Sequence, residues 1–300
     1  MNGLLIIDKP AGITSHDVVS RVRRILKIKR VGHTGTLDPF ATGVMVILVG
    51  QATRLAQFLD KDEKEYEAVV KFGFATDTGD ATGSRVADNE MRGDEVASRV
   101  ASVDWGDVFG NFRGRIEQIP PMFSAKKIEG QKLYEHARKG KILERKPVAI
   151  TISKLGLLDT ACDSIRIRVV CSAGTYIRTL AEDIGSKIGI GAHLAELRRT
   201  RAGKFSIEHC LTLDQLENLD RLLAALLGMS EAVSHLPILT LPDDRIERTN
   251  NGLSTRVLNT ENFADGDAVQ MHDARGNLIA VGVFSEAENS VRPKVVLAIG

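Results

Sequence analysis

GHTGTLDPFATG, residues 32–43, is a loop sequence that leads directly into the continuous apolar run of residues 44–49. The apolar run predicts a central strand that is buried on both faces. Pro39 removes one backbone N–H and disfavours the α region for Asp38, and the glycines of the loop permit sharp bends and close backbone approach. The sequence therefore predicts that this loop presents one carboxylate, that of Asp38, beside a core strand.

Two other interpretations of this loop stay open on the loop alone. An Asp before Pro among Gly and Thr residues is a common turn signal, which favours an ordinary surface loop. The letters TGTLD are also similar to the Asp-Lys-Thr-Gly-Thr loop of phosphorylated ATPases, but Gly32 occupies the position of that nucleophile. An aspartyl-phosphate mechanism would therefore lack its nucleophile here.

The composition describes a globular chain with one large domain or two unequal ones. The 300 residues are 43% hydrophobic and 26% charged, which is enough for a substantial core. The three cysteines, Cys162, Cys171 and Cys210, lack the paired spacing of a metal site and suit reduced thiols. The N-terminus has no basic segment followed by a long apolar stretch, and no apolar run approaches the length of a membrane span. We expect a cytoplasmic protein without a metal and without a membrane partner.

Basic residues gather in three places although the net charge is only +1. They lie at residues 21–30, between residues 126 and 146, and in a group that contains Arg198, Arg199 and Lys204. A single basic run is most often a solvated face. Three runs that converge on one loop would suit a phosphate backbone, and they predict salt-sensitive binding of a nucleic acid.

Hydrophobic periodicity predicts an α+β arrangement without internal repeats. The predicted strands lie at residues 4–7, 66–72 and 165–169. One predicted helix begins at Thr14 or Ser15, and two others cover residues 177–188 and 213–227. No Gly-rich phosphate-binding string opens any of these helices, so we expect no nucleotide cofactor. After Ser230 the chain changes to short apolar runs between Pro, Asp, Asn and Gly, with a hairpin predicted at residues 269–284. We therefore divide the chain into a larger domain that carries the Asp38 loop, residues 1–230, and a small β domain, residues 231–300.

Three further blocks of sequence accompany the Asp38 loop. They read YEAVVKFGFATDTGDATG at residues 66–83, IPPMFSAKKIEGQKLYEHARKG at 119–140, and CSAGTYIRTLAEDIG through GAHLAELRRTRAGKF at 171–205. Together with the Asp38 loop, these blocks resemble the TruB family of tRNA pseudouridine synthases. The opening GLLIIDKPAGITSHDVV is also similar to that family, and its Lys9-Pro10 pair is expected to support the catalytic loop. The resemblance implies a mixed-sheet pseudouridine synthase domain followed by a PUA-like RNA-binding module.

The resemblance also implies the roles of the pocket residues. Asp38 would be the catalytic carboxylate that isomerises uridine 55 in the TΨC loop of tRNA without a cofactor. Arg178, within GTYIR, would be its basic partner and would hold it ionised and oriented. Tyr66 would stack on the target base and handle the proton on C5, and Tyr176 and Leu197 would form walls of the pocket.

The expected partner is the T-arm stem-loop of tRNA, with no obligatory protein partner. A stacked uridine hides its C1′ and C5 atoms, so the base must be flipped out of the loop. By resemblance, His33 would displace or stack against neighbouring nucleotides, and Asp80 would contact either RNA or the pocket arginine. Arg198, Arg199 and Lys204 are further candidates for RNA contacts.

Two function classes remain as alternatives to an isomerase. A non-catalytic RNA-binding or RNA-folding protein would keep the basic runs and the pocket aromatics but would have lost the acid that Asp38 supplies. A uridine-nucleoside hydrolase would need a second catalytic carboxylate or a metal cluster, and the matched blocks supply neither.

Overall fold

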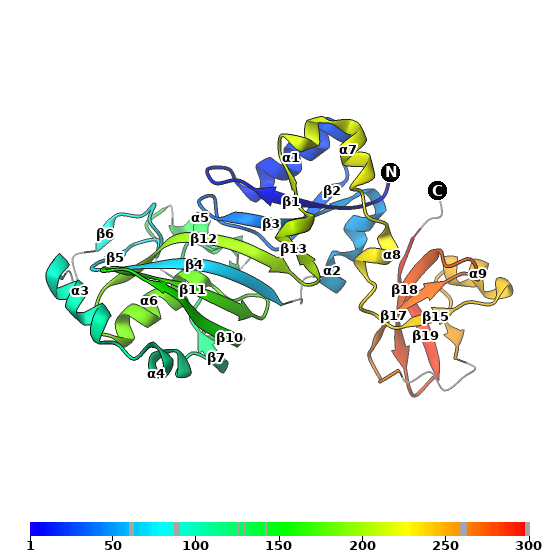
Figure 1. Cartoon of the computed structure of the whole chain (residues 1–300). Helices are drawn as coiled ribbons and strands as arrows, with labels where there is room; N and C mark the ends of the chain where they lie inside the picture. The colour runs from blue at the N-terminus through cyan, green and yellow to red at the C-terminus, as the bar shows by residue number, and fades with distance from the viewer. Residues whose placement is uncertain are drawn as a thin grey trace.

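A ten-stranded mixed sheet forms the centre of the computed structural model (Figure 1). The structure describes residues 1–59, 63–86, 91–124, 126–128, 130–137, 139–141, 143–257 and 263–297, so parts of the second basic run lie outside the described residues. The strand order is β14-β1-β3-β12-β4-β11-β10-β7, with β13 paired to β12 and β2 paired to β3. The strands are β1 (Gly3–Lys9), β2 (Val31–Thr34), β3 (Thr42–Val49), β4 (Lys64–Phe72), β7 (Gly114–Gln118), β10 (Val148–Thr160), β11 (Ser164–Cys171), β12 (Ala192–Ala202), β13 (Phe205–Ser206) and β14 (Leu211–Thr212).

Strand β3 confirms the predicted core strand, since every residue from 43 to 49 is buried. Successive side chains of a strand point to opposite faces of the sheet. The side chains of β1 and β3 therefore pack into two different hydrophobic cores, one on each face. Met45 and Ile47 pack against the apolar face of α1 (Ser15–Leu26), whereas Val44 and Val46 join the core that contains Leu278 of the C-terminal domain. The strand that follows the Asp38 loop is therefore held from both sides.

Helix α1 begins as its sequence predicts. Thr14 is the N-cap, and its side chain and that of Asp17 form a reciprocal capping box. The helix ends where Lys27 adopts a left-handed conformation with φ of 54°. The helix predicted at residues 177–188 is α6 (Ile177–Lys187).

The prediction of one helix over residues 213–227 is wrong. The structure has a short 3-10 turn, η3 (Gln215–Glu217), and then α7 (Leu219–Ala224). Between them the Asn218 side chain accepts a hydrogen bond from the backbone N–H of Arg221 and caps α7. A good N-cap residue inside an apolar pattern thus starts a new helix in place of continuing one.

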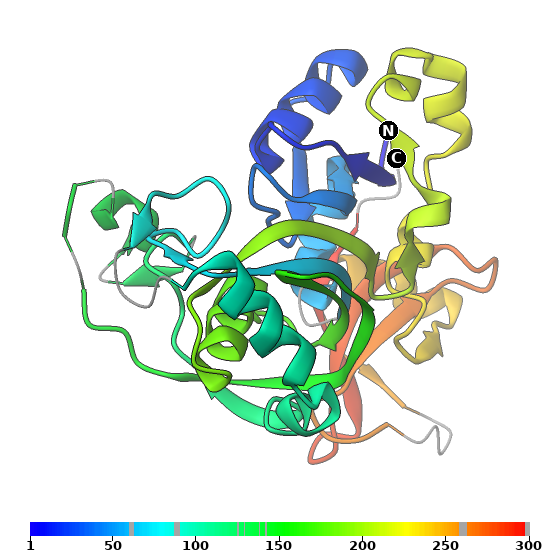
Figure 2. The ribbon, with the colours of Figure 1, turned by 60° about the vertical axis from the view of Figure 1, so that its left-hand side comes forward.

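The large sheet curls around α6, which is covered by α3 (Gly93–Ser102) and α4 (Trp105–Gly110) (Figure 2). The remaining short elements are η1 (Gly50–Leu55), α2 (Ala56–Leu59), β5 (Ala75–Thr76), β6 (Arg85–Val86), β8 (Lys127–Ile128), β9 (Gln131–Lys132), α5 (Leu133–Ala137), η2 (Ile207–His209) and α8 (Met229–Ala232). None of the helices that the structure describes is both long enough and apolar enough to cross a membrane.

A five-stranded sheet follows α8 and makes up the C-terminal part of the chain (Figure 1). Its elements are β15 (Ile238–Thr240), α9 (Asp243–Asn250), β16 (Thr255–Arg256), β17 (Ala268–His272), β18 (Leu278–Ser285) and β19 (Ser290–Val296). Strands β17 and β18 pair antiparallel and confirm the predicted hairpin. Leu278 and Val281 pack into the core beneath β1 and β3, and Arg54 donates to the backbone carbonyl of Val296. The mixed α+β fold with a small β sheet at the C-terminal end agrees with the sequence prediction.

Candidate active site

Contacts on both sides fix the loop that carries Asp38. The buried Lys9 Nζ donates to the backbone carbonyls of Pro10 at 2.9 Å, Pro39 at 3.2 Å and Ala41 at 2.7 Å. Before Asp38, the backbone N–H and carbonyl of Leu37 are both bonded to the Ser15 hydroxyl, at 2.9 and 3.0 Å. The position of the carboxylate is thus set by β1 and by the start of α1.

Replacing Lys9 tests this support. In Lys9→Met the three carbonyl oxygens lose their donor in a buried site, so we expect the free energy of unfolding to fall by about 2–4 kcal/mol. Urea denaturation followed by circular dichroism measures the change. Lys71→Met, which removes an exposed ion pair with Asp163, is the matched control and should change the same quantity by less than about 1 kcal/mol. Equal losses in both variants would contradict a supporting role for Lys9.

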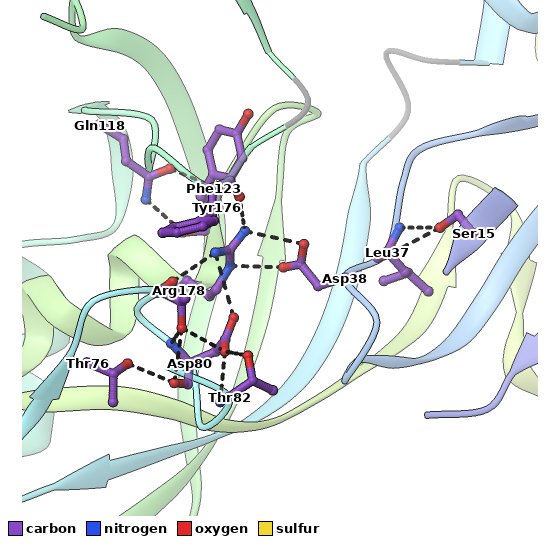
Figure 3. A network of polar contacts seen from close by, with 11 residues as sticks. Ser15, Leu37, Asp38, Thr76, Asp80, Thr82, Gln118, Phe123, Tyr176 and Arg178 are labelled. Carbon is purple, nitrogen blue, oxygen red and sulfur yellow. Dashed lines mark hydrogen bonds and ion pairs between the residues drawn. The ribbon is translucent and has the colours of Figure 1, made fainter. Parts of the chain in front are cut away.

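Arg178 makes a bidentate contact with Asp38 (Figure 3). Its Nε lies 2.9 Å from Asp38 Oδ2, and its Nη2 lies 3.3 Å from Asp38 Oδ1. The arginine side chain is only 4% exposed, whereas that of Asp38 is 32% exposed. The same guanidinium donates to the carbonyls of Thr78 at 2.8 Å and Phe123 at 2.7 Å. One buried cation therefore joins three separate segments of the chain at the carboxylate.

Asp80 lies on the other side of this guanidinium. Its Oδ2 is 3.7 Å from Arg178 Nη1, and its Oδ1 accepts hydrogen bonds from both Thr78 and Thr82. The side chain is 7% exposed. Asp80 therefore contacts the pocket arginine, which is one of the two partners expected for it.

Several causes act in opposite directions on the pKa of Asp38. Burial raises the pKa of Asp38 above that of an ordinary carboxyl group, the positive charge of Arg178 lowers it, and the carboxylate of Asp80 raises it again. The net direction is upward. A carboxylate that has lost much of its hydration and depends on one guanidinium is a reactive group, as active sites require.

An apolar floor lies beside the carboxylate. Tyr66 on β4 is 9% exposed and Leu197 on β12 is 8% exposed, and both belong to one core cluster with Leu37 of the Asp38 loop. Tyr176 caps α6, and its backbone N–H and carbonyl are both bonded to the Gln118 side chain, at 2.8 and 2.9 Å (Figure 3). The structure thus brings all five predicted pocket residues to the region around Asp38 and α6.

Comparisons with known proteins agree with this arrangement. A model described as the TruB family pseudouridylate synthase N-terminal domain matches residues 23–177, and one described as the tRNA pseudouridylate synthase B C-terminal domain matches residues 178–234. The chain belongs to the TruB family. A relative named tRNA pseudouridine synthase B from Solibacter usitatus (strain Ellin6076) is 40% identical over 300 residues, which cover 99% of this chain and all of the relative. One of the same name from Geobacillus thermodenitrificans (strain NG80-2) is 44% identical over 266 residues, 86% of each chain.

A solved structure extends the TruB similarity to the fold. It is described as an H/ACA RNP bound to a substrate RNA containing 2′-deoxyuridine, and it shares 26% sequence identity with this chain at a TM-score of 0.74. The match covers 99% of this chain and 85% of the other. The mixed sheet and the small C-terminal sheet therefore have a counterpart in this H/ACA RNP structure.

The residues predicted to contact RNA differ in their exposure and in their ion pairs. Arg198 is half-buried in an ion pair with Asp8 at 2.8 Å, and Lys204 is ion-paired with Glu231. His33 lies on β2, and burial lowers the pKa of its imidazole. These three side chains retain exposed surface and remain candidates.

The structure corrects the expectation that Arg199 contacts RNA. Its side chain is 1% exposed, and it donates to the carbonyls of Val44 at 2.6 Å and Gly35 at 3.1 Å. A guanidinium enclosed in this way cannot grip a phosphate group at the surface. Arg199 instead connects β12 with the Asp38 loop and β3.

Two residues beside the candidate site were not singled out in the sequence. Gln118 fixes the start of α6 as described above, and Glu182 lies one helical turn after Arg178. The Glu182 carboxylate lies against Gly79, in the turn that carries Asp80. Any side chain at position 79 would collide with it, because its Cβ atom would lie 2.6 Å from Glu182 Oε1. The spacing of four residues on one helix was the available signal for Glu182. Across the described ranges, no group of three or more His, Cys, Asp or Glu side chains is placed to hold a metal ion.

Glu182 should make the stability of the protein depend on pH. Burial, with a smaller contribution from Asp183, raises its pKa from 4.5 to about 7. The folded state then binds more protons than the unfolded state between these two values, so this group destabilises the fold as pH rises through that window. Glu182→Gln should therefore be more stable than the parent protein at pH 8, by about 1–3 kcal/mol, with a smaller difference at pH 5. Urea denaturation at both pH values measures this, and a gain that is equal at pH 5 and pH 8 would contradict it.

Proposed function

We propose that this protein is a cofactor-independent isomerase that converts uridine 55 in the TΨC loop of tRNA into pseudouridine. The observation that carries the proposal is the partly exposed Asp38 carboxylate, which the buried Arg178 holds in a bidentate contact beside apolar core residues. The family and the names of the relatives support the same reaction and the same RNA class.

The reaction breaks the N1–C1′ glycosidic bond and rejoins the sugar to C5 of the same base, without net hydrolysis. A glycosidase generally uses two carboxylates, one to protonate the leaving group and one to attack or activate water. Here Asp38 is 32% exposed, whereas Asp80 is 7% exposed and its Oδ1 is already bonded to two threonines. A flipped base would meet one accessible carboxylate, which suits an isomerase better than a hydrolase.

The pocket residues then take the following roles. Asp38 is the catalytic carboxylate, and Arg178 orients it and keeps it ionised. Tyr66 stacks on the uracil ring and receives the C5 proton, while Tyr176 and Leu197 confine the ring. The target uridine must leave its stack to reach them, so the T-arm stem-loop is bound with this base flipped.

RNA is gripped outside the pocket by the candidates that keep exposed surface, His33, Arg198 and Lys204. The chain after residue 230 is assigned to the PUA-like RNA-binding module, in a secondary role. Residues 231–300 hold ten Asp and Glu but only six Lys and Arg, so most of the electrostatic attraction for phosphate falls to the catalytic domain. The three cysteines are free, which supports our assignment to the cytoplasm, and we propose that no protein partner is obligatory.

A tritium-release assay tests the function directly. An unmodified tRNA transcript labelled at uracil C5 is incubated with the protein alone, and the expected result is release of one label per transcript. The matched control is the same transcript with cytidine in place of uridine 55, which should release no label. Binding of the transcript without release would reject the isomerase and favour a non-catalytic RNA-binding protein.

A further inference from the structure

Arg199 and Tyr66 face each other directly across two strands of the central sheet. They are register partners in the antiparallel pair of β12 and β4. Directly opposed residues place their side chains on the same face, with Cβ atoms about 4.5–5.5 Å apart. Both side chains are buried, at 1% and 9% exposure. The arginine therefore lies beneath the pocket, next to the proposed base-stacking tyrosine.

The Arg199 guanidinium is held in one orientation. Its Nε donates to the carbonyl of Val44 at 2.6 Å, and its Nη2 donates to the carbonyl of Gly35 at 3.1 Å. Its positive charge lowers the pKa of the Tyr66 hydroxyl, its register partner on β4. Two backbone oxygens, one on β3 and one in the Asp38 loop, thus hold the cation in place beside Tyr66.

No carboxylate forms an ion pair with Arg199 among the residues that the structure describes. A buried cation without a counter-charge is unfavourable for folding, because it has lost its hydration. A negative charge on the oxygen of Tyr66, the register partner of Arg199, would supply the missing counter-charge. The arrangement is therefore unfavourable in the resting state and becomes favourable when the phenol ionises.

The charged and titratable groups around Tyr66 act in both directions. Burial raises the pKa of Tyr66, and the positive charge of Arg199 is the main opposing cause. Cys171 on β11 and Asp38 in the loop each raise it further. Lys64, two residues earlier on β4 and on the same face, is a second nearby cation. Arg199 is thus the group that most favours ionisation of a phenol whose surroundings otherwise oppose it.

We propose that Arg199 is a positioning residue that orients the Tyr66 hydroxyl and stabilises its deprotonated form, so that Tyr66 can act as the base toward C5. This inference rests on the proposed function, in which Tyr66 faces the uracil ring. The phenol first loses its proton to water. After the base has been joined to the sugar through C5, the phenolate oxygen takes the C5 proton, and the electron pair of the broken C–H bond restores the ring double bond.

The test measures the ionisation of Tyr66 without RNA. The chain has three tyrosines, so protein labelled with ¹³C at tyrosine Cζ gives three resonances, and Tyr66→Phe identifies that of Tyr66. Arg199→Gln should move the titration of this resonance upward by about one pH unit or more. Arg201→Gln is the matched control. Arg201 lies on β12 like Arg199, but it is paired with Glu65, so its removal should leave the Tyr66 titration unchanged. An unchanged Tyr66 titration in Arg199→Gln would overturn the proposal.

Two further measurements keep the outcomes distinct. If Arg199→Gln does not fold, Arg199→Lys takes its place. It retains the charge but cannot reproduce the forked contacts, so the Tyr66 titration should stay close to that of the parent protein while kcat falls, and an unchanged kcat would overturn the positioning role. In the tritium-release assay, Arg199→Gln should lower kcat about 10- to 100-fold with little change in KM, and raising the pH should restore part of the rate. A raised Tyr66 titration with an unchanged pH profile of kcat would overturn the catalytic part. No release by the parent protein would reject the proposed function itself.

Discussion

Asp38→Asn should abolish pseudouridine formation, lowering single-turnover tritium release by at least about 10⁴-fold. The amide has nearly the same shape as the carboxylate, but it is neither a nucleophile nor a base. It also turns an N–H group toward the Arg178 guanidinium in place of one of the two oxygens at 2.9 and 3.3 Å. Affinity for the tRNA transcript should change less than tenfold, since the phosphate contacts lie outside the pocket.

Asp163→Asn is the matched control for this substitution. It makes the same carboxylate-to-amide change at an exposed ion pair with Lys71, and its rate should equal that of the parent protein. Filter binding and circular dichroism separate a loss of chemistry from a loss of binding or folding. If Asp38→Asn retained turnover within tenfold of the parent rate, Asp38 would not be the catalytic carboxylate.

The parts of the fold with local signals were predictable from the sequence. The continuous apolar run of β3 identifies a strand buried on both faces, and the Thr14 and Asp17 capping box fixes the start of α1. The segment at 213–227 was not predictable in the same way, since its apolar spacing continues through Asn218 while the backbone does not. Periodicity reports which residues are buried, and capping decides where one helix ends and the next begins.

The site depends on contacts that sequence spacing does not show. Asp38 and Arg178 are 140 residues apart along the chain and meet only because the sheet brings the loop before β3 next to the start of α6. The burial of Arg199 was visible in principle, because it lies two residues after Leu197 on the same strand and so shares its face. A cluster of basic residues in the sequence does not show which of them point to the buried face. In addition, the pairing of β12 with β4 shifts register between residues 194 and 196 and between 199 and 201.

Arg178→Met should combine the second-largest loss of activity with a loss of stability. The substitution removes the Nε and Nη2 donors that hold the Asp38 carboxylate. It also removes the donors to the carbonyls of Thr78 and Phe123. Removing one member of a buried ion pair generally lowers the free energy of unfolding by about 3–5 kcal/mol. We expect the rate of tritium release to fall by about 10³-fold, because the carboxylate loses both its orientation and its counter-charge.

The remaining activity of Arg178→Met should also respond differently to pH. Arg178 lowers the pKa of Asp38 against the effects of burial and Asp80, so its removal raises that pKa further. The acid limb of the pH–rate profile should move to higher pH, and more of the remaining rate should be recovered in alkaline buffer. Arg178→Lys is the second variant, because a single ammonium keeps the charge but cannot make the bidentate contact. Its acid limb should stay close to that of the parent protein while its rate is still reduced, which separates the charge of Arg178 from its geometry. If the acid limb stayed in place in Arg178→Met as well, the guanidinium would not be the group that holds Asp38 ionised.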